Sequence, residues 1–517
     1  MAFDKLMRRD FSCVVSFFCS SIPSLHAVNF RYFFDVTKLN FPRIQPPFDT
    51  KGLTSILPKF LIMANRGNFS GRIGFILAAA GSAVGLGNIW RFPYLAGTNG
   101  GAGFLLIYLM CIFTLCFPVM VGEIAIGRKV GSDAYGSYQK LGGGKWGYLG
   151  LFGILAGLFI LSFYNVVAGW AFGYFLEISF GDLLDQQDFG AFFGNYVNDI
   201  GPLFLFSLAF MLITAYIVSQ GIAKGIEAAN KIMMPALYLI LIGLIVYSLT
   251  LPNAMAGVKF YLIPDVGEIT SRTIFYALCQ AFFSLSLGMG ALITYGSYVT
   301  KDQNIVSSAA VISIADTSVA FLAGLMVFPL VFSLGAEPGQ GPKLIFVILT
   351  QAFQNMGPIV GRIVGGSFFL LICFAALTST ISLLEVPAAY LVDQKKFPRK
   401  AVVWSLAVGI FVLGLPSLFS QGIVPALNKL PLHNSPDFLS FVSDMCDISL
   451  TVGGCLMCFF IRYRWKMNNL NEELTLGNPS FMGSFIQKYI NFTISWVCPI
   501  VLSILSVLVI IDKFFGI

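Results

Sequence analysis

Charged residues are scarce in this chain. Asp, Glu, Lys and Arg make up only 11% of the 517 residues, whereas 57% are hydrophobic. Apolar stretches repeatedly reach the roughly 20 residues that span a lipid bilayer. The sequence therefore predicts a multi-pass, all-α membrane protein. The formal net charge of +7 does not indicate a nucleic-acid partner, because the basic residues lie in short loops between apolar stretches, where membrane topology places them.

Histidine is almost absent, and the cysteines follow no pattern. The chain has two distant histidines, His26 and His433, and ten cysteines scattered mostly through apolar segments. This distribution supports neither a His-based metal site nor a disulfide framework. Cys455 and Cys458 form a C-x-x-C sequence, but it follows a Gly-Gly pair in an apolar segment and favours packing over redox chemistry. The intramembrane residues show no nucleophile with a neighbouring base, which argues against an enzyme.

Eleven membrane spans are predicted from the lengths of the apolar stretches. They cover approximately 72–99, 102–128, 146–179, 201–220, 229–251, 270–297, 304–333, 359–394, 400–420, 438–465 and 491–512. An amphipathic segment at 342–356 is predicted to cap one face without crossing. The predicted domains are an N-terminal extension, 1–62, and a membrane domain, 63–515.

Residues 1–62 differ from the rest of the chain. Their apolar run at 11–19 is too short to span a bilayer, and the mixed segment 31–51 contains three prolines. Basic residues before a short apolar run are also typical of a signal peptide. We favour another interpretation, because Met63 is followed directly by a polar, basic lead into the first span. The extension is then a disordered tail, or upstream sequence that is not normally translated.

Basic residues are distributed unequally between the two sides of the predicted spans. Most lie on the side of the N-terminus, while the opposite loops hold only Lys259, Arg272, Lys343, Arg362 and Lys429. This asymmetry predicts a cytoplasmic N-terminus and, with an odd number of spans, an external C-terminus. The loop at 180–200 agrees with an external position, because it has four aspartates and no basic residue.

Two of the predicted spans are interrupted by glycine. The first reads G-S-A-V-G-L-G-N-I-W-R-F-P at 81–93, and the second reads Q-A-F-F-S-L-S-L-G-M-G-A-L-I-T-Y-G-S-Y at 280–298. Each glycine lowers helix stability, so both spans are predicted to be pairs of half-helices. Close packing would explain either glycine cluster alone. Their separation by five spans favours instead two inverted five-helix repeats, 72–251 and 270–466, with an extra helix at 491–512 and a binding site at the midplane.

Polar side chains are predicted at the depth of the two breaks. They are Asn88, Ser284, Ser286, Asp316, Thr378 and Ser379. A carboxylate within a span is costly, which makes Asp316 a functional candidate. The hydroxyls of Thr378 and Ser379 could instead bond to carbonyls of their own helix. Hard oxygen ligands without nitrogen or sulfur suit an alkali or alkaline-earth cation.

Five motifs together resemble the neurotransmitter:sodium symporter family, and specifically its bacterial sodium-dependent amino-acid transporters. Besides 81–93 and the F-F-S-L-S-L-G-M-G stretch that begins at 282, they are N-G-G-A-G-F at 99–104, G-I-A-K-G-I-E at 221–227 and A-A-L-T-S-T-I-S-L-L-E at 375–385. The likeness covers about 65–511. It implies the LeuT-type fold, with broken helices 1 and 6, in the inner cell membrane.

The resemblance also implies two sodium sites. The first would combine the carbonyl of Ala83 with Asn88, Ser284, Asp316 and the substrate carboxylate. The second would combine the carbonyls of Gly81, Val84 and Ala375 with the hydroxyls of Thr378 and Ser379.

The implied substrate site surrounds the first break. Tyr164 and the amides near Leu86 and Gly87 would bind the carboxylate of an amino acid. The other substrate-binding residues would be Ala83, Ile160, Phe283, Ser284, Ser286, Met289, Ser382 and Leu383. Their largely apolar side chains suggest a hydrophobic or aromatic amino acid.

Three positions refine this expectation. Gly85 stands where monoamine carriers of the family have an aspartate, which favours an amino acid over a monoamine. Tyr108 and Gln280 match groups around the halide of chloride-dependent relatives, but Ala320 replaces a chloride-binding serine. Asp316 replaces the more usual asparagine, and a fixed carboxylate could stand in for chloride because like charges disfavour each other. Transport is therefore predicted to be chloride-independent.

The resemblance also implies two gates. Arg66, Tyr298 and Asp393 would form the cytoplasmic gate. Arg91 would form the outer gate with an aspartate of the tenth span, but Asp444 does not align with the expected position, so this partner stays open. The chain has eleven predicted spans where twelve are more common, which leaves the oligomeric state open.

The predicted function is sodium-coupled symport of an amino acid by alternating access, with two sodium ions. Two alternatives stay open. A proton-coupled amino-acid permease of the same architecture would have Asp316 bind a proton in place of a cation, and a non-transporting membrane sensor would keep the fold without needing the hydroxyl pair at 378–379.

Overall fold

The computed structural model describes residues 67–336, 343–422, 424–428 and 437–515. The predicted extension 1–62 and the predicted gate residue Arg66 lie outside these residues. In the described part, every regular element is a helix.

Nine helices of the described residues are long and apolar enough to cross a membrane. Four of them coincide with or contain one short preceding turn and a long helix: α7 (Gly147–Phe180) in Gly144–Phe180, α9 (Ile200–Ser219), α10 (Ala228–Ser248) in Ile222–Ser248, and α14 (Ile305–Ser333). The others are α4 (Ala102–Cys111) with α5 (Phe117–Val130) in Ala102–Val130, α16 (Pro358–Lys395), α17 (Arg399–Phe419), α19 (Phe438–Phe459) in Phe438–Trp465, and α21 with α22 in Phe485–Phe514. A tenth span is a bent pair, α2 (Arg72–Ala83) with Gly87–Thr98, whose halves meet at 51°. The helices α12 (Ser271–Ser284) and α13 (Ala291–Gly296) flank the second predicted break. Counted as one span, they complete the predicted eleven.

The last span begins earlier than its prediction at 491. Helix α21 (Phe485–Phe492) continues through a π-helical turn, Thr493–Val497, into α22 (Cys498–Phe515). Helix α21 has a polar face as well as an apolar one. The length of a continuous apolar stretch therefore does not reveal where this helix begins.

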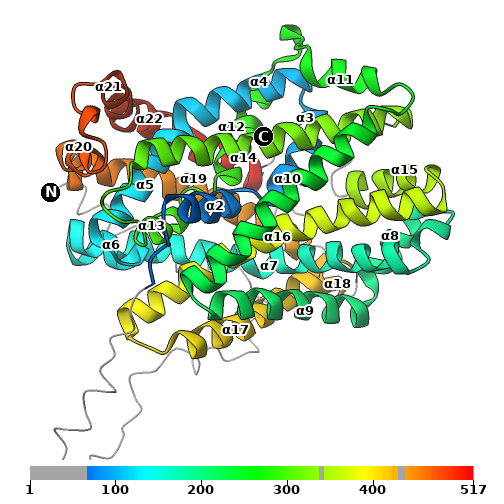
Figure 1. The fold of residues 1–517 in the computed structure, drawn as a ribbon, viewed down its shortest axis with the longest axis horizontal. Coiled ribbons are helices and arrows are strands. Elements are labelled where there is room, and N and C mark those ends of the chain that lie inside the picture. Colours follow the sequence, from blue (N-terminus) through cyan, green and yellow to red (C-terminus); the bar gives the residue numbers. More distant parts are fainter. Residues whose placement is uncertain (1–66, 337–342, 423, 429–436, 516–517) are drawn as a thin grey trace, which may run out of the picture. The chain divides into compact units, whose positions relative to one another are not determined.

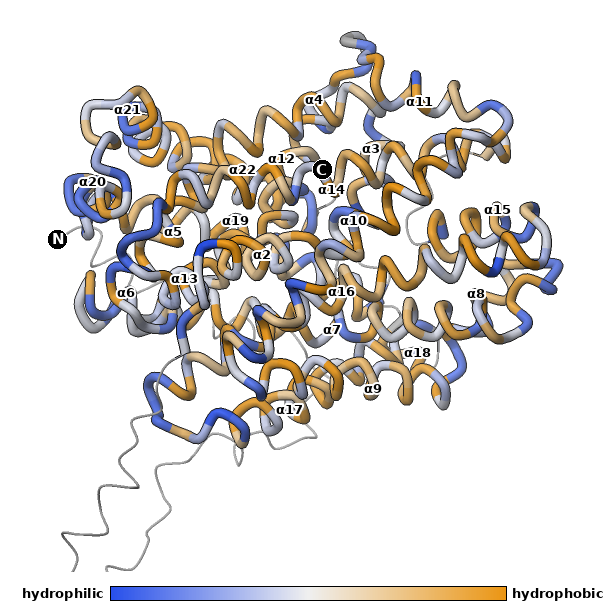
Figure 2. The backbone as a smooth tube through the Cα atoms, viewed as in Figure 1, coloured by the Kyte–Doolittle hydropathy of each residue, from blue (hydrophilic) through white to orange (hydrophobic). Residues whose placement is uncertain are grey.

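Short helices lie at the two ends of the bundle. Figure 1 shows α6 (Ala134–Gly142) and α20 (Met467–Thr475) at one end, and α8 (Phe189–Asn198) and α15 (Thr350–Asn355) at the other. The amphipathic segment predicted at 342–356 forms the helical stretch Leu344–Asn355. Hydrophobic residues follow the long helices, whereas α20 is largely hydrophilic (Figure 2). Polar residues therefore concentrate where the spans end.

Small residues allow the central helices to approach the second break closely. A Cβ on Gly153 of α7 would lie 2.9 Å from the carbonyl carbon of Met289, and one on Gly453 of α19 would lie 2.2 Å from the carbonyl oxygen of Gly288. The second break therefore passes between α7 and α19 with backbone in contact on both sides. Helix α16 packs along α7 and also contacts α2. The two breaks are thus enclosed by α7, α16 and α19.

Candidate functional site

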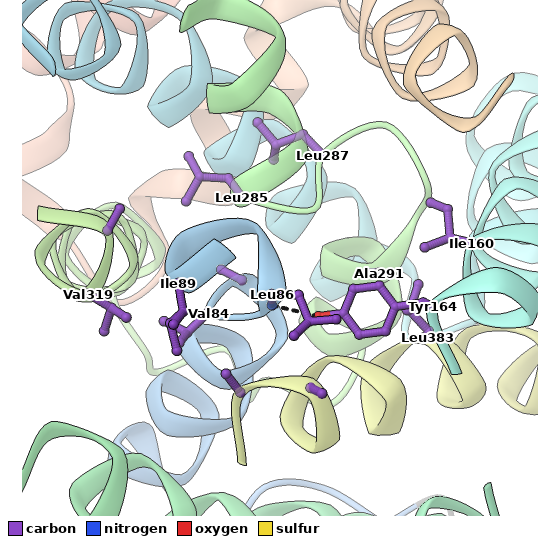
Figure 3. Packing of buried hydrophobic residues seen from close by; sticks show 14 of the residues in the cluster. Val84, Leu86, Ile89, Ile160, Tyr164, Leu285, Leu287, Ala291, Val319 and Leu383 are labelled. Carbon is purple, nitrogen blue, oxygen red and sulfur yellow. Dashed lines mark hydrogen bonds between the residues drawn. The ribbon is translucent and has the colours of Figure 1, made fainter. Parts of the chain in front are cut away.

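The first break is a short non-helical segment with bound amides. Helix α2 ends at Ala83, Val84 is extended (φ −68°, ψ 115°), and a π-helical turn, Gly87–Arg91, leads into α3 (Phe92–Thr98). The Gly85 amide donates to Asn88 Oδ1 at 3.0 Å, and the Leu86 amide donates to the Tyr164 hydroxyl at 2.8 Å. Figure 3 shows the Tyr164 side chain reaching Leu86. Side chains therefore satisfy the backbone groups that the break releases.

The second break contains three residues in the left-handed region. Ser286, Gly288 and Gly290 have φ of 54°, 86° and 77°. The Ser286 hydroxyl donates to the carbonyl of Ser82 at 3.0 Å. This bond joins the second break to the first one, so the two breaks lie side by side.

A buried carboxylate that the sequence analysis missed holds the second break. Glu123 of α5 is 1% exposed, and its Oε1 accepts a hydrogen bond from the Gly288 amide at 2.7 Å. The sequence could have indicated Glu123 as a functional candidate, because a Glu inside an apolar span is as unusual as an Asp. Its role depends on Gly288, which lies 165 residues away in the sequence.

Three side chains predicted for the first sodium site, those of Asn88, Ser284 and Asp316, form one hydrogen-bonded cluster with Tyr108. Asn88 Nδ2 donates to Asp316 Oδ1 at 2.8 Å and to Ser284 Oγ at 3.0 Å. The Ser284 hydroxyl donates to Asp316 Oδ2 at 2.8 Å, and Tyr108 donates to the same oxygen at 3.5 Å. All four side chains are buried.

The charge of this cluster suits a cation. Within the described residues, no Lys, Arg or His forms an ion pair with Asp316. An unpaired buried carboxylate is costly, and a bound cation would supply the missing positive charge. The oxygens of Asp316 and Ser284 are hard ligands of the kind that sodium takes. Asn88 turns its amide nitrogen toward them, while its Oδ1 accepts from the Gly85 amide.

The residues predicted for the second sodium site also converge. Thr378 Oγ1 donates to the carbonyl of Val84 at 3.1 Å and to that of Ala375 at 2.9 Å, and Ser379 Oγ donates to Val84 at 3.2 Å. A Cβ on Gly81 would lie 3.3 Å from Thr378 Cβ. The bond from Thr378 to Ala375 stays within α16, as the alternative interpretation of these hydroxyls predicts. Both hydroxyls also bond to Val84 in the first break. The two hydroxyls of α16 therefore face the Val84 carbonyl of the first break.

A cavity of about 30 Å³ lies between the two breaks and α7. Its lining includes the predicted substrate-binding residues Ala83, Gly87, Ile160, Tyr164, Phe283, Ser284, Ser286, Met289 and Leu383. Ser82, Gly85, Ser379 and Leu450 also line it, and the last of these comes from α19. Two predicted residues do not line it: Leu86 contributes its amide to Tyr164, and Ser382 donates to the carbonyl of Ser379 on its own helix at 2.8 Å.

Comparison with known proteins identifies the family. The family model described as the sodium:neurotransmitter symporter family matches residues 66–188 and 188–514. The chain belongs to this family. A sodium-dependent transporter of Bacillus subtilis, YhdH, is 38% identical over 413 residues, which cover 79% of this chain and 90% of the relative. A sodium-dependent transporter of Haemophilus influenzae is 32% identical over 461 residues, which cover 86% of this chain and 98% of the relative.

A solved structure shows the same architecture. The crystal structure of MhsT in complex with L-phenylalanine has 41% sequence identity and a TM-score of 0.79, and the match covers 87% of this chain and 100% of that chain. The predicted fold class, an all-α membrane protein of the LeuT type with broken helices 1 and 6, is confirmed. The chain is therefore a multi-pass membrane transporter of a sodium-dependent symporter family, and not an enzyme.

An ion pair lies beside Phe283, one of the residues that line the symporter's cavity. Arg91 NH1 and NH2 donate to Asp447 Oδ1 and Oδ2 at 3.0 and 2.6 Å. The Arg91 guanidinium also lies 4.5 Å from the ring centroid of Phe283, which lines the cavity. The open question of the Arg91 partner is thereby answered by Asp447. Asp444, one turn earlier on α19, pairs instead with Lys513 of α22 at 2.7 Å.

A different cluster lies at the opposite end of the symporter. The Tyr298 hydroxyl donates to Glu385 Oε1 at 2.7 Å, and the same carboxylate pairs with Arg399. Asp393 Oδ2 accepts from the Asp133 amide at 2.9 Å. Sequence analysis missed Glu385 and Arg399, although Glu385 closes the motif at 375–385. The predicted gate of Arg66, Tyr298 and Asp393 stays a prediction, because Arg66 is outside the described residues.

Proposed function

We propose that this transporter is a sodium-coupled symporter of a hydrophobic or aromatic amino acid, that it works by alternating access, and that it uses two sodium ions. The observation that carries the proposal is the cavity at the meeting point of the two breaks. Its lining joins an apolar set, including Ile160, Phe283 and Leu383, to Tyr164, whose hydroxyl accepts a hydrogen bond from the Leu86 amide.

The polar end of the cavity suits an amino-acid carboxylate. The Tyr164 hydroxyl and the buried backbone at the start of the π-helical turn, Gly87–Arg91, would offer hydrogen-bond donors at a helix N-terminus, where an anion is favoured. Ser284 lines the cavity and also bonds to Asp316. A substrate carboxylate would therefore lie next to the first sodium set. Each ligand would then raise the affinity for the other, because the carboxylate and the cation attract each other.

The apolar lining of the cavity supports a hydrophobic or aromatic side chain. Its volume of about 30 Å³ is far below the roughly 300–1,000 Å³ of ligand pockets, so the lining residues would have to move apart when such a substrate binds. The described lining contains no Asp or Glu that could pair with a substrate amine. A Cβ on Gly85 would lie 2.4 Å from Ser379 Oγ and 2.7 Å from the Tyr164 hydroxyl, so a larger residue fits here only if these two side chains move. The L-phenylalanine of the MhsT structure supports the same substrate class.

Chloride independence is part of the proposal. Ala320 has no side-chain oxygen to bind a halide, and Asp316 already places a buried carboxylate beside Tyr108. A second anion next to this carboxylate would be repelled. Gln280 is also engaged, because its Nε2 donates to the carbonyl of Gly87 at 2.8 Å.

The proposed cellular arrangement follows the distribution of basic residues. It places the protein in the inner cell membrane with a cytoplasmic N-terminus. In that orientation the Arg91–Asp447 pair faces outward, and the Glu385–Arg399 pair faces the cytoplasm.

Uptake into proteoliposomes tests the proposal. Purified protein should accumulate labelled L-phenylalanine when an inward sodium gradient is applied, and replacing chloride with gluconate should leave the rate unchanged. Uptake driven by a proton gradient without sodium would support the permease alternative, which rests on the burial of Asp316. A thermal-shift panel of amino acids with and without sodium would define the substrate, and a panel without any sodium-dependent shift would contradict the proposal.

A further inference from the structure

A second hollow lies on the outside of the bundle, away from the central cavity. It has a volume of about 420 Å³ and lies between the span Ala102–Val130, the beginning of α14, and α21. Its lining is mainly apolar and includes Phe113, Phe117, Val306, Ala310, Phe485 and Ile486. We call it the α14–α21 groove. Its volume falls within the roughly 300–1,000 Å³ of ligand pockets.

The groove is held in shape by a tether between two of its walls. The hydroxyl of Tyr489, which lines the groove, donates to the carbonyl of Phe113 and, at 3.2 Å, to that of Thr114. These carbonyls belong to the π-helical turn Ile112–Cys116, where the normal helical bonds are displaced. Helix α21 is therefore fastened to the span that it crosses, and the groove is built into the fold.

One end of the groove is positively charged. Arg72, the first residue of α2, donates to the hydroxyl of Ser307 at 2.5 Å, and Ser307 lines the groove. Within the described part of the chain, no carboxylate forms an ion pair with Arg72. Ser307 lies in the first turn of α14, whose N-terminus carries a partial positive charge. An anion at this end would be attracted both by the positive charge of Arg72 and by the partial positive charge at the N-terminus of α14.

The surroundings of the groove are those of a membrane boundary. Phe485 is 82% exposed and Phe113 is 43% exposed on its walls. Helix α21 also carries the exposed Lys488, one turn from Phe485 and without an acidic residue in the helix. An amphipathic helix with exposed aromatics and a basic face is typical of the bilayer interface.

We infer that the α14–α21 groove binds an anionic phospholipid of the surrounding bilayer, with one acyl chain in the groove and the phosphate on Arg72. The apolar lining matches an acyl chain. The Arg72 guanidinium, which has no carboxylate partner among the described residues, matches the phosphate as a bidentate donor. Basic pockets between membrane spans are known to bind anionic lipid headgroups. The site is separate from the transport cavity, so it does not depend on which amino acid is carried.

Native mass spectrometry of the purified, delipidated protein tests this site, with phosphatidylglycerol and phosphatidylcholine titrated separately. The wild type should bind a first phosphatidylglycerol more tightly than phosphatidylcholine. Arg72→Gln should weaken phosphatidylglycerol binding about fivefold, the effect of roughly one basic residue near a membrane surface. Phosphatidylcholine binding should change little. Arg72→Lys should retain most of the preference, because it keeps the charge.

Two further variants separate the groove from general attraction to the protein surface. Ala310→Phe fills the groove without changing charge and should weaken both lipids. Lys400→Gln removes an exposed charge from the first turn of α17, away from the groove, and should leave both affinities at the wild-type value. Equal loss in Lys400→Gln and Arg72→Gln, or unchanged binding in Ala310→Phe, would overturn the inference. Thermal unfolding without added lipid checks that each variant is folded.

Discussion

The two breaks of the symporter look alike in sequence but are built differently. At the first break the backbone keeps φ values open to any residue, −68° at Val84 and −56° at Leu86. Glycine is needed there because Ser379 and Tyr164 lie against the chain at Gly85. At the second break, Gly288 and Gly290 have φ of 86° and 77°. Glycine is needed there for its conformation.

This difference has a functional meaning. The first break is bound mainly by side chains that also belong to the ion and substrate sets, namely Asn88, Tyr164, Thr378 and Ser379. The second break packs between the backbones of α7 and α19, and its Gly288 amide donates a hydrogen bond to Glu123. Changes at the first break should therefore alter ligand binding, and changes at the second should alter folding.

The largest effect is expected from Gly288→Ala. Its Cβ would lie 2.2 Å from the carbonyl oxygen of Leu450, and a left-handed conformation costs a non-glycine residue roughly 1–2 kcal/mol in addition. Size-exclusion chromatography in detergent should show little monodisperse protein. Gly85→Ala meets only side-chain ends, so it should yield folded protein with weakened phenylalanine binding. If Gly288→Ala folds with wild-type stability, the second break does not need glycine for its conformation, and the proposed difference between the two breaks is wrong.

Glu123→Ala should come next. It leaves the buried Gly288 amide without its acceptor, which costs about 2 kcal/mol of the free energy of unfolding. The midpoint of thermal unfolding should fall clearly. Glu123→Gln keeps a carbonyl oxygen for the same bond and should recover most of the loss. If both variants unfold at the wild-type temperature, the second break does not depend on this contact.

Asn88→Ala should weaken binding without a comparable loss of folding. The change removes the bonds to Asp316, Ser284 and Gly85, so the sodium concentration for half-maximal phenylalanine binding should rise at least about tenfold. Ser313→Ala is the matched control, because this buried hydroxyl lies one turn from Asp316 on α14 but contacts Met120. An equal shift in both variants would contradict the first sodium set.

Thr378→Ala should have the smallest effect of the four. It removes one hydroxyl from the second sodium set, and the same binding measurement should show a shift of about fivefold. Thr380→Ala, two residues along α16, loses a bond to Thr214 on the other side of the helix and should leave sodium dependence unchanged. If sodium dependence is unaltered in Thr378→Ala, the Thr378 hydroxyl of α16 does not bind sodium and the second sodium set is wrong.

Much of the fold could be predicted because it depends on local sequence. Apolar length predicted the spans, and clustered glycines predicted both breaks, since helix stability is a property of a few neighbouring residues. The start of α21 was missed for the same reason, because its polar face interrupts the apolar run. Of the predicted site, Asn88, Ser284 and Asp316 meet in the structure, and their role in sodium binding stays a prediction. Ser382 does not line the cavity, since its hydroxyl bonds to its own helix.

The sequence by itself determined which chemical groups lie at membrane depth, and only the tertiary structure decided which of them meet. Asp444 and Asp447 are three residues apart, and residues at this spacing lie on nearly the same face of a helix. Spacing could not choose between them. The placement of α19 does, since it directs Asp447 to Arg91 of the π-helical turn and Asp444 to Lys513 of α22. The pairs of Glu123 with Gly288 and of Glu385 with Arg399 depend in the same way on how whole helices are rotated and placed.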